Sequence, residues 1–413
     1  MALFVQIGAT RDGLDPYLHA ARAHAMQAVL IETPDYIRLR RALGRQEFDI
    51  TLAVEHPAHE DEVVAALEQL PDIPSIILAG FERYIYNVYR IAHRLHIPPC
   101  DEKTHFAPPD KAMQRTMLTR KHIPIQQPGY ITLEHGMLTE QELASLAYPV
   151  VVKPVDGGGG LGIFLAYNFA EVKAALARLH ATANYDGEAF SGVIIEEYIR
   201  GTEYSIQGVA HDGRSQILAL CKKVILIEPI EAENQITLYS FREAGHLASA
   251  GDQADAATQQ FSQACVDAFG YRNGPFHIDM IETSDGYAFL EMGFRLSGNG
   301  LAKLVRLVSG YDWGEEVFSI FTGVRAAPPL QIDKALRFGG QITATSQKAL
   351  DTAHQLQEQG YAIEIDLFPS VSAPVATRSL EADLSRHLGT RGRIIVRASS
   401  MEEVERILER CSS

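Results

Sequence analysis

The chain has 413 residues, a length that predicts two to four domains rather than one compact core. Its hydrophobic fraction of 46% and charged fraction of 22% are typical of a globular protein. The formal net charge of −15 argues against nucleic acid as the main partner, because a phosphate backbone needs a basic protein face. The four cysteines are scattered, no apolar run reaches membrane-spanning length and no signal peptide precedes the first strand, so we expect a cytoplasmic protein without a membrane partner.

The first hundred residues alternate short apolar runs with helix-type segments. Strands are expected at 3–7, 28–31, 48–54 and 75–79, and helices at 16–28, 60–69 and 84–96. This alternation favours a parallel α/β sheet. The glycines at 8–13 do not form a G-x-G-x-x-G pattern, so the dinucleotide-binding fingerprint is weak there.

The middle of the chain changes from mixed to mainly β. Helices are expected at 110–122, at the capping box Thr139-Glu-Gln-Glu142, and from the box at 168–171 to about 180. Strands follow at 193–197, 203–211 and 216–223, then a helix at 259–269 and a hairpin of 274–281 with 286–292. A last block from about residue 330 has strands at 339–345, 362–367 and 393–397 and two helices.

A lysine and a glycine-rich turn stand together on a predicted β-hairpin. The run Tyr148-Pro-Val-Val-Val-Lys153-Pro-Val-Asp-Gly157-Gly-Gly-Gly160-Leu-Gly162 delivers one lysine and then four consecutive glycines. Glycine lets backbone N–H groups approach an anion, and the lysine adds a positive charge. The pattern indicates a phosphate clamp, and a flexible turn beside a surface lysine is the simpler alternative. It is not a P-loop, because no Gly-Lys-Ser/Thr follows the glycines.

Two carboxylates are expected face to face on the later hairpin. If Ser284-Asp285-Gly286 is a three-residue loop, Thr283 pairs with Tyr287, and Asp279 then lies opposite Glu291. Directly opposed residues share a face, with Cβ atoms roughly 5 Å apart. Two carboxylates there repel each other unless a cation lies between them, and hard oxygen ligands suit Mg²⁺. The alternative, a carboxylate solvated at a strand edge, is less favoured because both lie in apolar strands.

Three further charged groups suggest contacts to a nucleotide. Arg295 stands in a glycine-rich turn four residues after the second carboxylate and is a candidate to hold a phosphate or carboxylate. Lys111 begins a helix, and helix N-termini favour anions. Glu196, Glu197 and Glu203 surround a strand end, where a carboxylate can hold ribose hydroxyls and backbone groups can pair with an adenine edge. Taken singly, Arg295 is as well explained by a solvated surface charge, and for Lys111 and the glutamates that alternative is the stronger one.

These pieces, in this order and spacing, resemble the ATP-grasp superfamily of carboxylate–amine ligases. The resemblance covers roughly residues 75–325 and is carried by Asp110-Lys111, Tyr148-Pro-Val-Val-Val-Lys153-Pro with its glycine loop, Glu196-Glu197-Tyr198-Ile199 with Glu203, and Asp279 with Glu291-Met-Gly-Phe-Arg295-Leu-Ser-Gly298. It implies an α/β chain with the ATP-grasp fold. The expected domains are a Rossmann-like domain at 1–105, a mobile lid at 106–200, a catalytic domain at 201–328 and a C-terminal α+β block at 329–413.

The resemblance implies a role for each matched residue. The ATP phosphates would contact Lys111 and Lys153 under a loop that includes Gly158, Gly159 and Gly160. Adenine would be held by Glu196 and the adjoining Glu197, Tyr198 and Ile199, and ribose by Glu203. One or two Mg²⁺ ions, with Mn²⁺ as an alternative, would be bound by Asp279 and Glu291. The acyl phosphate would be stabilised by Arg295, with Lys153 and Gly298 completing the catalytic set.

The chain departs from the family pattern at one position. Most members read Glu-x-Asn-x-Arg with the Asn as a metal ligand, whereas Gly293 stands there in this chain, so the number of metal ions stays open. A similar loss is familiar from bacterial L-amino-acid ligases of the bacilysin-synthetase and dapdiamide-synthetase type, and the run from Glu243 to His246 resembles their Glu-x-x-His element. By that analogy Glu243 would pair with a substrate ammonium, His246 would line the amino-acid pocket and Asn299 would influence its size. A solvated loop is the alternative for the Glu-x-x-His run.

The implied activity is ATP-dependent amide formation between the carboxylate of one amino acid, or modified amino acid, and the amine of another. It proceeds through an acyl phosphate and releases ADP and phosphate. Glu82, at a strand end of the first domain, is a further candidate substrate contact. The resemblance also implies a homodimer and a role in peptide-antibiotic biosynthesis. The alternatives are another ATP-grasp reaction, of the carboxylase or purine-ligase type, and nucleotide binding without catalysis.

Overall fold

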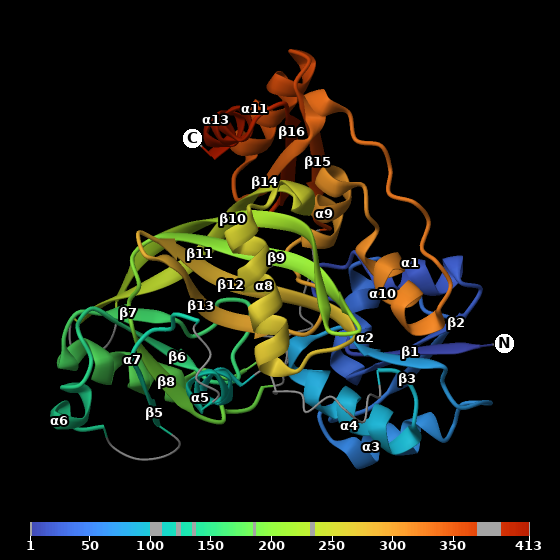
Figure 1. Cartoon of the computed structure of the whole chain (residues 1–413), viewed down its shortest axis with the longest axis horizontal. Helices are drawn as coiled ribbons and strands as arrows, with labels where there is room; N and C mark the ends of the chain where they lie inside the picture. Colours follow the sequence, from blue (N-terminus) through green and yellow to red (C-terminus); the bar gives the residue numbers. More distant parts are fainter. Residues whose placement is uncertain are drawn as a thin grey trace.

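A four-stranded parallel sheet, in the order β3-β2-β1-β4, forms the first part of the chain (Figure 1). A computed structural model describes residues 2–99, 110–120, 125–133, 138–184, 187–231, 236–369 and 390–412. The elements of the first part are β1 (Leu3–Ile7), α1 (Pro16–Ala23), β2 (Gln27–Glu32), α2 (Pro34–Ala42), β3 (Ile50–Ala53), α3 (Glu60–Leu67), β4 (Ile76–Ala79), η1 (Glu82–Tyr84) and α4 (Ile85–Leu95). The parallel sheet is the one that the alternation of strand and helix predicted.

Alternate residues of β1 point into two different cores, as the period of a strand requires. Val5 and Ile7 pack in the core that also holds side chains of α3 and α4. Phe4 points the other way, and its ring lies 5.0 Å from that of Phe318 on α10 (Trp313–Thr322). A helix from late in the chain therefore covers one face of the N-terminal sheet and fixes that sheet against the rest of the protein.

The helices of this part differ from the sequence expectation in two ways. α1 ends at Ala23 rather than at residue 28, because the chain turns at His24 and enters β2. α2 was not predicted, although it begins with the standard signals: Thr33 accepts a hydrogen bond from the Tyr36 N–H and a proline follows the cap. Its apolar periodicity is weak because an arginine, Arg40, occupies one of its buried positions.

A twelve-stranded sheet makes up most of the remaining chain, and its main path runs β13-β12-β9-β10-β11-β7-β6-β8-β5. The elements from residue 110 to 197 are α5 (Lys111–Arg120), β5 (Tyr130–Leu133), α6 (Glu140–Leu143), β6 (Val150–Pro154), β7 (Phe164–Ala166), α7 (Phe169–Ala181) and β8 (Val193–Glu197). The following elements are β9 (Thr202–His211), β10 (Arg214–Glu231), β11 (Thr237–Ala250), η3 (Gly251–Gln253), α8 (Ala256–Phe269), β12 (Gly274–Thr283), β13 (Gly286–Gly293), α9 (Leu301–Ser309) and α10. Both predicted N-caps, at Thr139 and Asn168, are confirmed.

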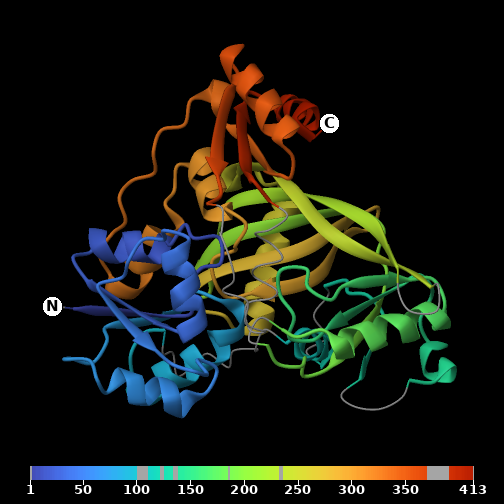
Figure 2. The same cartoon turned by 180° about the vertical axis from the view of Figure 1, so that it is seen from behind.

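The long strands β10 and β11 join the part of the chain that contains the glycine hairpin to the C-terminal block, and these two parts have separate cores (Figures 1 and 2). One end of β11 pairs with β7, and its Leu238 is buried in the core formed by β6, β7, β8 and α7. The other end pairs with β14 of the C-terminal block. That block consists of η4 (Lys334–Leu336), β14 (Phe338–Ala344), α11 (Gln347–Glu358), β15 (Ala362–Leu367), β16 (Gly392–Ala398) and α13 (Met401–Ser412). The glycine hairpin and the C-terminal block are thus connected through one continuous ribbon.

The β12–β13 hairpin has a different turn from the one predicted. Thr283 pairs with Gly286, so the turn has two residues rather than three. A β-bulge at Leu290 then inserts one residue into β13 and shifts the register by one. The two deviations cancel, and Asp279 lies directly opposite Glu291, as predicted.

The Glu-x-x-His run, from Glu243 to His246, lies on β11 and not in a solvated loop, and it contains a second bulge. Glu243 pairs with Ile225 and His246 pairs with Lys223, while Ala244 is the extra residue between them. Residues three apart on a regular strand face opposite sides, so the bulge is what places Glu243 and His246 on the same face.

Two other expectations concern the whole chain. No helix among the described residues is long and apolar enough to cross a membrane. Cys221, Cys265 and Cys411 are buried free thiols. Cys100 and the predicted domain boundary at residue 105 lie outside the described residues.

Candidate functional site

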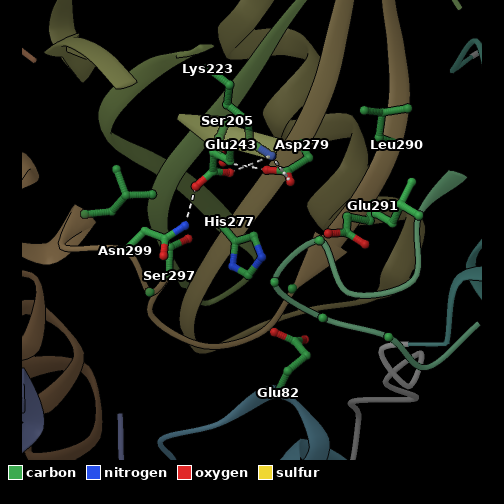
Figure 3. Close-up of a pocket in the computed structure, with 18 of the residues that line it drawn as sticks. Glu82, Ser205, Lys223, Glu243, His277, Asp279, Leu290, Glu291, Ser297 and Asn299 are labelled. Atoms are coloured by element: carbon green, nitrogen blue, oxygen red, sulfur yellow. Dashed lines mark hydrogen bonds and ion pairs between the residues drawn. The ribbon is translucent and has the colours of Figure 1, made fainter. Parts of the chain in front are cut away.

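One cavity of about 1210 Å³ is lined by every residue that the sequence analysis assigned to the site. These residues are Glu82, Lys111, Lys153, Gly158, Gly159, Gly160, Glu196, Glu197, Tyr198, Ile199, Glu203, Glu243, His246, Asp279, Glu291, Arg295, Gly298 and Asn299. Figure 3 shows part of this lining. The grouping is an observation, whereas the individual roles stay predictions.

Two lysines that the sequence placed on separate segments point into the same end of the cavity. Lys153, on β6, pairs with the buried carboxylate of Glu196 at 2.7 Å, and Arg115 pairs with that carboxylate at 2.8 Å. Burial lowers the pKa of Lys153, and the opposing effect of Glu196 does not fully offset it. Burial would raise the pKa of Glu196, but Arg115 and Lys153 lower it. Glu196 therefore stays ionised and holds Lys153 in place.

The glycine hairpin is tied to the start of α5. Its strands β6 and β7 are antiparallel, as predicted, and Gly159 and Gly160 have φ angles of 62° and 77° that favour glycine. Lys111 Nζ donates to the carbonyl of Gly157 at 2.7 Å, and the Lys111 N–H donates to the carbonyl of Val155 at 3.0 Å. The lysine and the glycine loop therefore act as one unit at the cavity edge.

Asp279 and Glu291 are opposed on the hairpin, but each is paired with a different lysine. Asp279 lies 2.5 Å from Lys223 Nζ and accepts a hydrogen bond from Ser205 at 2.5 Å. Glu291 lies 2.9 Å from Lys111. Burial would raise the pKa of Glu291, but the lysines, Lys111 above all, lower it far below its usual value. Two carboxylates on one face fit a hard divalent cation that arrives with phosphates to replace the lysines.

Lys223 is the functional candidate that sequence reasoning missed. It lies on β10, and its ammonium is within 2.8 Å of Glu203 and 3.8 Å of Glu243, in addition to the Asp279 pair. Burial would lower the pKa of Lys223, but the three carboxylates raise it well above its usual value. The available signal was the Lys222-Lys223 pair between two apolar runs of one strand, because a buried charge needs partners.

Arg295 and Glu82 meet across two parts of the chain. Arg295 follows β13, Glu82 begins η1 after β4, and the two side chains are 2.6 Å apart. Arg295 also donates to the carbonyl of Leu296 at 2.6 Å. This pair brings the N-terminal sheet to the same cavity and orients the guanidinium that the sequence analysis considered for a phosphate or carboxylate.

The far end of the cavity holds Glu243, His246 and Asn299. Asn299 Nδ2 donates to Glu243, and Gln341 of the C-terminal block donates to the carbonyl of Asn299. His246 is 1% exposed, its Nε2 atom is 3.4 Å from Glu243, and burial lowers its pKa. A neutral imidazole and an ionisable carboxylate beside a polar amide can receive an ammonium group.

The segment predicted to bind adenine already uses some of its polar groups. The N–H of Glu197 donates to the carbonyl of Gly129 at 2.9 Å, and the N–H of Tyr198 donates to that of Pro149 at 3.0 Å. An adenine contact from this segment would therefore come from its remaining backbone groups.

A different group of residues has the spacing of a preassembled metal site. His56, His59 and Glu62 offer donor atoms that all lie within 4.8 Å of one another, and both histidines are exposed. They do not line the large cavity. Among the described residues this is the group of three or more donors that meets that spacing.

Comparison with known proteins shows which family part of the chain is similar to. Residues 146–303 match the model of the ATP-grasp domain family. Dapdiamide A synthase of Enterobacter agglomerans is 27% identical over 275 residues, which cover 65% of this chain and 62% of that protein, so the chain spans about three fifths of this relative's length.

Solved structures show the fold. L-amino acid ligase from Bacillus licheniformis superposes with a TM-score of 0.70 at 17% identity and covers 100% of this chain and 97% of its own. Carboxyaminoimidazole ribonucleotide synthase from Aspergillus clavatus, solved with ATP, has a TM-score of 0.68 at 16% identity and covers 100% and 97%.

Proposed function

The chain contains an ATP-grasp domain, and from this premise we propose that it is an ATP-dependent ligase that joins the carboxylate of one amino acid to the amine of another. An acyl phosphate would form from ATP and the first amino acid, and the amine would then displace phosphate. The observation that carries the proposal is that one cavity contains both the predicted phosphate contacts and the Glu243–Asn299 group.

The phosphate end supplies charge rather than a nucleophile. Lys111 and Lys223 pair with the opposed carboxylates of the β12–β13 hairpin, and Lys153 pairs with the buried Glu196 on β8. Phosphoryl transfer needs positioning and charge neutralisation above all. Asp279 and Glu291 would hold Mg²⁺, which would neutralise part of the phosphate charge. The glycine loop would exclude water, because an acyl phosphate hydrolyses readily.

The amino-acid end supplies recognition. Glu243 would pair with the ammonium of an amino acid, since it lies at the far end of the cavity on the same face as Lys223 and His246. Arg295, oriented by Glu82, would contact the carboxylate as it becomes an acyl phosphate. These assignments rest on position and charge, and the two substrates are defined only as amino acids.

An ADP-release assay with the twenty amino acids, singly and in pairs, tests the proposal. We expect ADP formation that depends on Mg²⁺ and on a pair of amino acids, with a dipeptide detected by mass spectrometry in the same mixture. In a second assay, hydroxylamine replaces the amine substrate. It would displace phosphate from the acyl phosphate of a single amino acid, and the products would be ADP, phosphate and a hydroxamate. If no combination of carboxylate and amine releases ADP, the ligase proposal is wrong.

A carboxylating ligase is the second candidate, because the Aspergillus neighbour of similar fold is a carboxyaminoimidazole ribonucleotide synthase. Bicarbonate in place of the amino-acid carboxylate distinguishes the two: ADP release that needs bicarbonate favours this alternative. Nucleotide binding with no ADP release under either condition would indicate a binding protein.

A further inference from the structure

His277 is a buried histidine of the cavity that the proposed function does not use. It lies on β12, is 8% exposed, and Figure 3 shows its ring in the cavity beside the acidic groups. In the register it is directly opposite Gly293, two residues from Asp279, which itself opposes Glu291. Residues two apart on a strand and residues directly opposed both share a face. His277 and the two carboxylates therefore face the same space.

The ring of His277 occupies the volume that a side chain at residue 293 would need. A Cβ atom added to Gly293 would lie 2.0 Å from Cε1 and 2.4 Å from Nε2 of the imidazole. In an amide side chain, the oxygen lies about 2.4 Å from the carbon that precedes the carbonyl, by standard bond lengths. Nε2 is therefore at the distance from residue 293 at which the oxygen of an asparagine would lie.

The other ring nitrogen is anchored. His277 Nδ1 is 3.4 Å from the backbone carbonyl of Arg295, which can only accept a hydrogen bond. This contact selects the tautomer with hydrogen on Nδ1 and leaves the Nε2 lone pair available to the cavity. An N–H bonded to a carbonyl, with the opposite nitrogen available, is the usual arrangement of a metal-binding histidine.

We propose that Nε2 of His277 is a nitrogen ligand of the divalent cation that Asp279 and Glu291 bind together with the nucleotide. The inference rests on the nucleotide–metal site of the proposed function and adds a ligand of different chemistry to it. Lys223 and Lys111 now hold the two carboxylates, so the site assembles when nucleotide phosphates attract these lysines.

A nitrogen ligand changes the preferred metal. Mg²⁺ prefers oxygen donors, whereas Mn²⁺ accepts imidazole as well as carboxylate. We therefore expect the nucleotide complex to prefer Mn²⁺ over Mg²⁺ more strongly than an all-oxygen site would. Hydrogen bonds support the carboxylate side: Gln207 donates to Ser205, and Ser205 donates to Asp279.

The direct test is pulsed EPR of Mn²⁺ bound to the whole chain with ADP and no amino acid. The protein carries His56→Ala and His59→Ala, because that exposed group could bind Mn²⁺ by itself. We expect a ¹⁴N coupling that becomes a ¹⁵N coupling when the histidines are ¹⁵N-labelled, which excludes the adenine nitrogens as its source. The coupling should disappear in His277→Ala. Its absence from the parent protein, or its survival in His277→Ala, would overturn the proposal.

A paired substitution guards against a merely destabilised variant. Gly293→Asn alone should not be accommodated, because its side chain would overlap the His277 ring. The double variant His277→Ala/Gly293→Asn has room for the amide oxygen. We expect it to bind Mn²⁺·ADP without histidine coupling and to shift the Mg²⁺-to-Mn²⁺ affinity ratio toward Mg²⁺ by about tenfold or more. An unchanged ratio would contradict the nitrogen ligand.

The outcome is independent of the ligation assay. Both measurements use ADP and metal alone, so a chain that ligates no amino acids can still show the coupling. Conversely, ligation without a histidine coupling would remove His277 from the metal and leave the proposed function intact.

Discussion

The two ends of the cavity are built in different ways. At the end proposed to bind phosphate, called here the phosphate end, short local segments deliver the charged groups: Lys153 and the glycines belong to one hairpin, and Lys111 begins one helix. At the end proposed to bind the amino acid, called here the amino-acid end, Glu243 and Asn299 come from distant segments and meet through a bulge and a turn. A bound phosphate needs donors and charge, which a local motif can provide, whereas shape recognition depends on the tertiary arrangement.

The charges of the two ends are nevertheless linked by one residue. Lys223 contacts Asp279 at the phosphate end and approaches Glu243 at the other. A nucleotide that attracts the lysine would release both carboxylates at once. The comparison between the two ends therefore predicts that substitutions separate into those that affect turnover, those that affect amino-acid binding and those that affect the nucleotide.

The largest effect should come from Arg295→Met, which removes the cavity-lining cation that pairs with Glu82. We expect turnover to fall by roughly 10³-fold, as for the loss of one strong transition-state contact, while ADP affinity changes by less than about twofold. ADP release and calorimetric ADP titration measure the two quantities.

Arg306→Met is the matched control, because Arg306 is exposed on α9 and pairs with Asp312. It should leave both quantities unchanged. Unchanged turnover in Arg295→Met would refute the role of Arg295, and an equal loss of ADP affinity would place it at the nucleotide instead.

The next effect should be confined to the amino-acid end. Glu243→Gln keeps the shape and removes the charge, so we expect the KM for one amino acid to rise by roughly 10- to 100-fold, the value of a hydrogen bond to a charged group. The KM for ATP should stay the same. Glu228→Gln on β10, where Glu228 pairs with the exposed Arg242, is the control. A matching rise in the KM for ATP would place Glu243 at the nucleotide.

The difference between the two ends also explains what the sequence could predict. The glycine hairpin, the helix caps and the Asp279–Glu291 pairing follow from local patterns, and all three are present. The pairing was predicted with the wrong turn, because the hairpin sequence does not distinguish a three-residue loop from a two-residue turn followed by a bulge at Leu290.

The amino-acid end was harder to predict for a physical reason. The Ala244 bulge is fixed by pairing with β10 and β14 on both sides of β11, and such pairing is not encoded within the strand. Lys223 was missed because its value depends on three carboxylates that are distant in the sequence. The role of a buried charge is defined by its partners.

A smaller effect should appear in the pH dependence of nucleotide binding. Lys153 has a lowered pKa because of its burial, so its charge is present at low pH and is lost as the pH rises through that lowered pKa. ADP affinity should therefore begin to fall at a lower pH than it would with an ordinary lysine. The expected loss of affinity is roughly tenfold, or about 1.4 kcal/mol. Arginine stays charged, so Lys153→Arg should flatten the profile. Lys173→Arg on α7 is the control, and identical profiles for all three proteins would contradict the prediction.

The smallest effect should distinguish the side chain of Asn299 from its backbone. Asn299 has a φ of 56°, a left-handed conformation that asparagine and glycine tolerate better than alanine. Asn299→Gly and Asn299→Ala both remove the donor to Glu243, so both should relax the preference for amino-acid size by a similar few-fold. Only Asn299→Ala should also lower the free energy of unfolding, by about 1 kcal/mol, because alanine is strained at this φ. Urea unfolding and competition between small and large amino acids measure the two effects. Equal stability of the two variants would show that the turn relaxes around alanine. A change of amino-acid preference in one variant alone would show that the backbone, and not the Glu243 contact, shapes the amino-acid end.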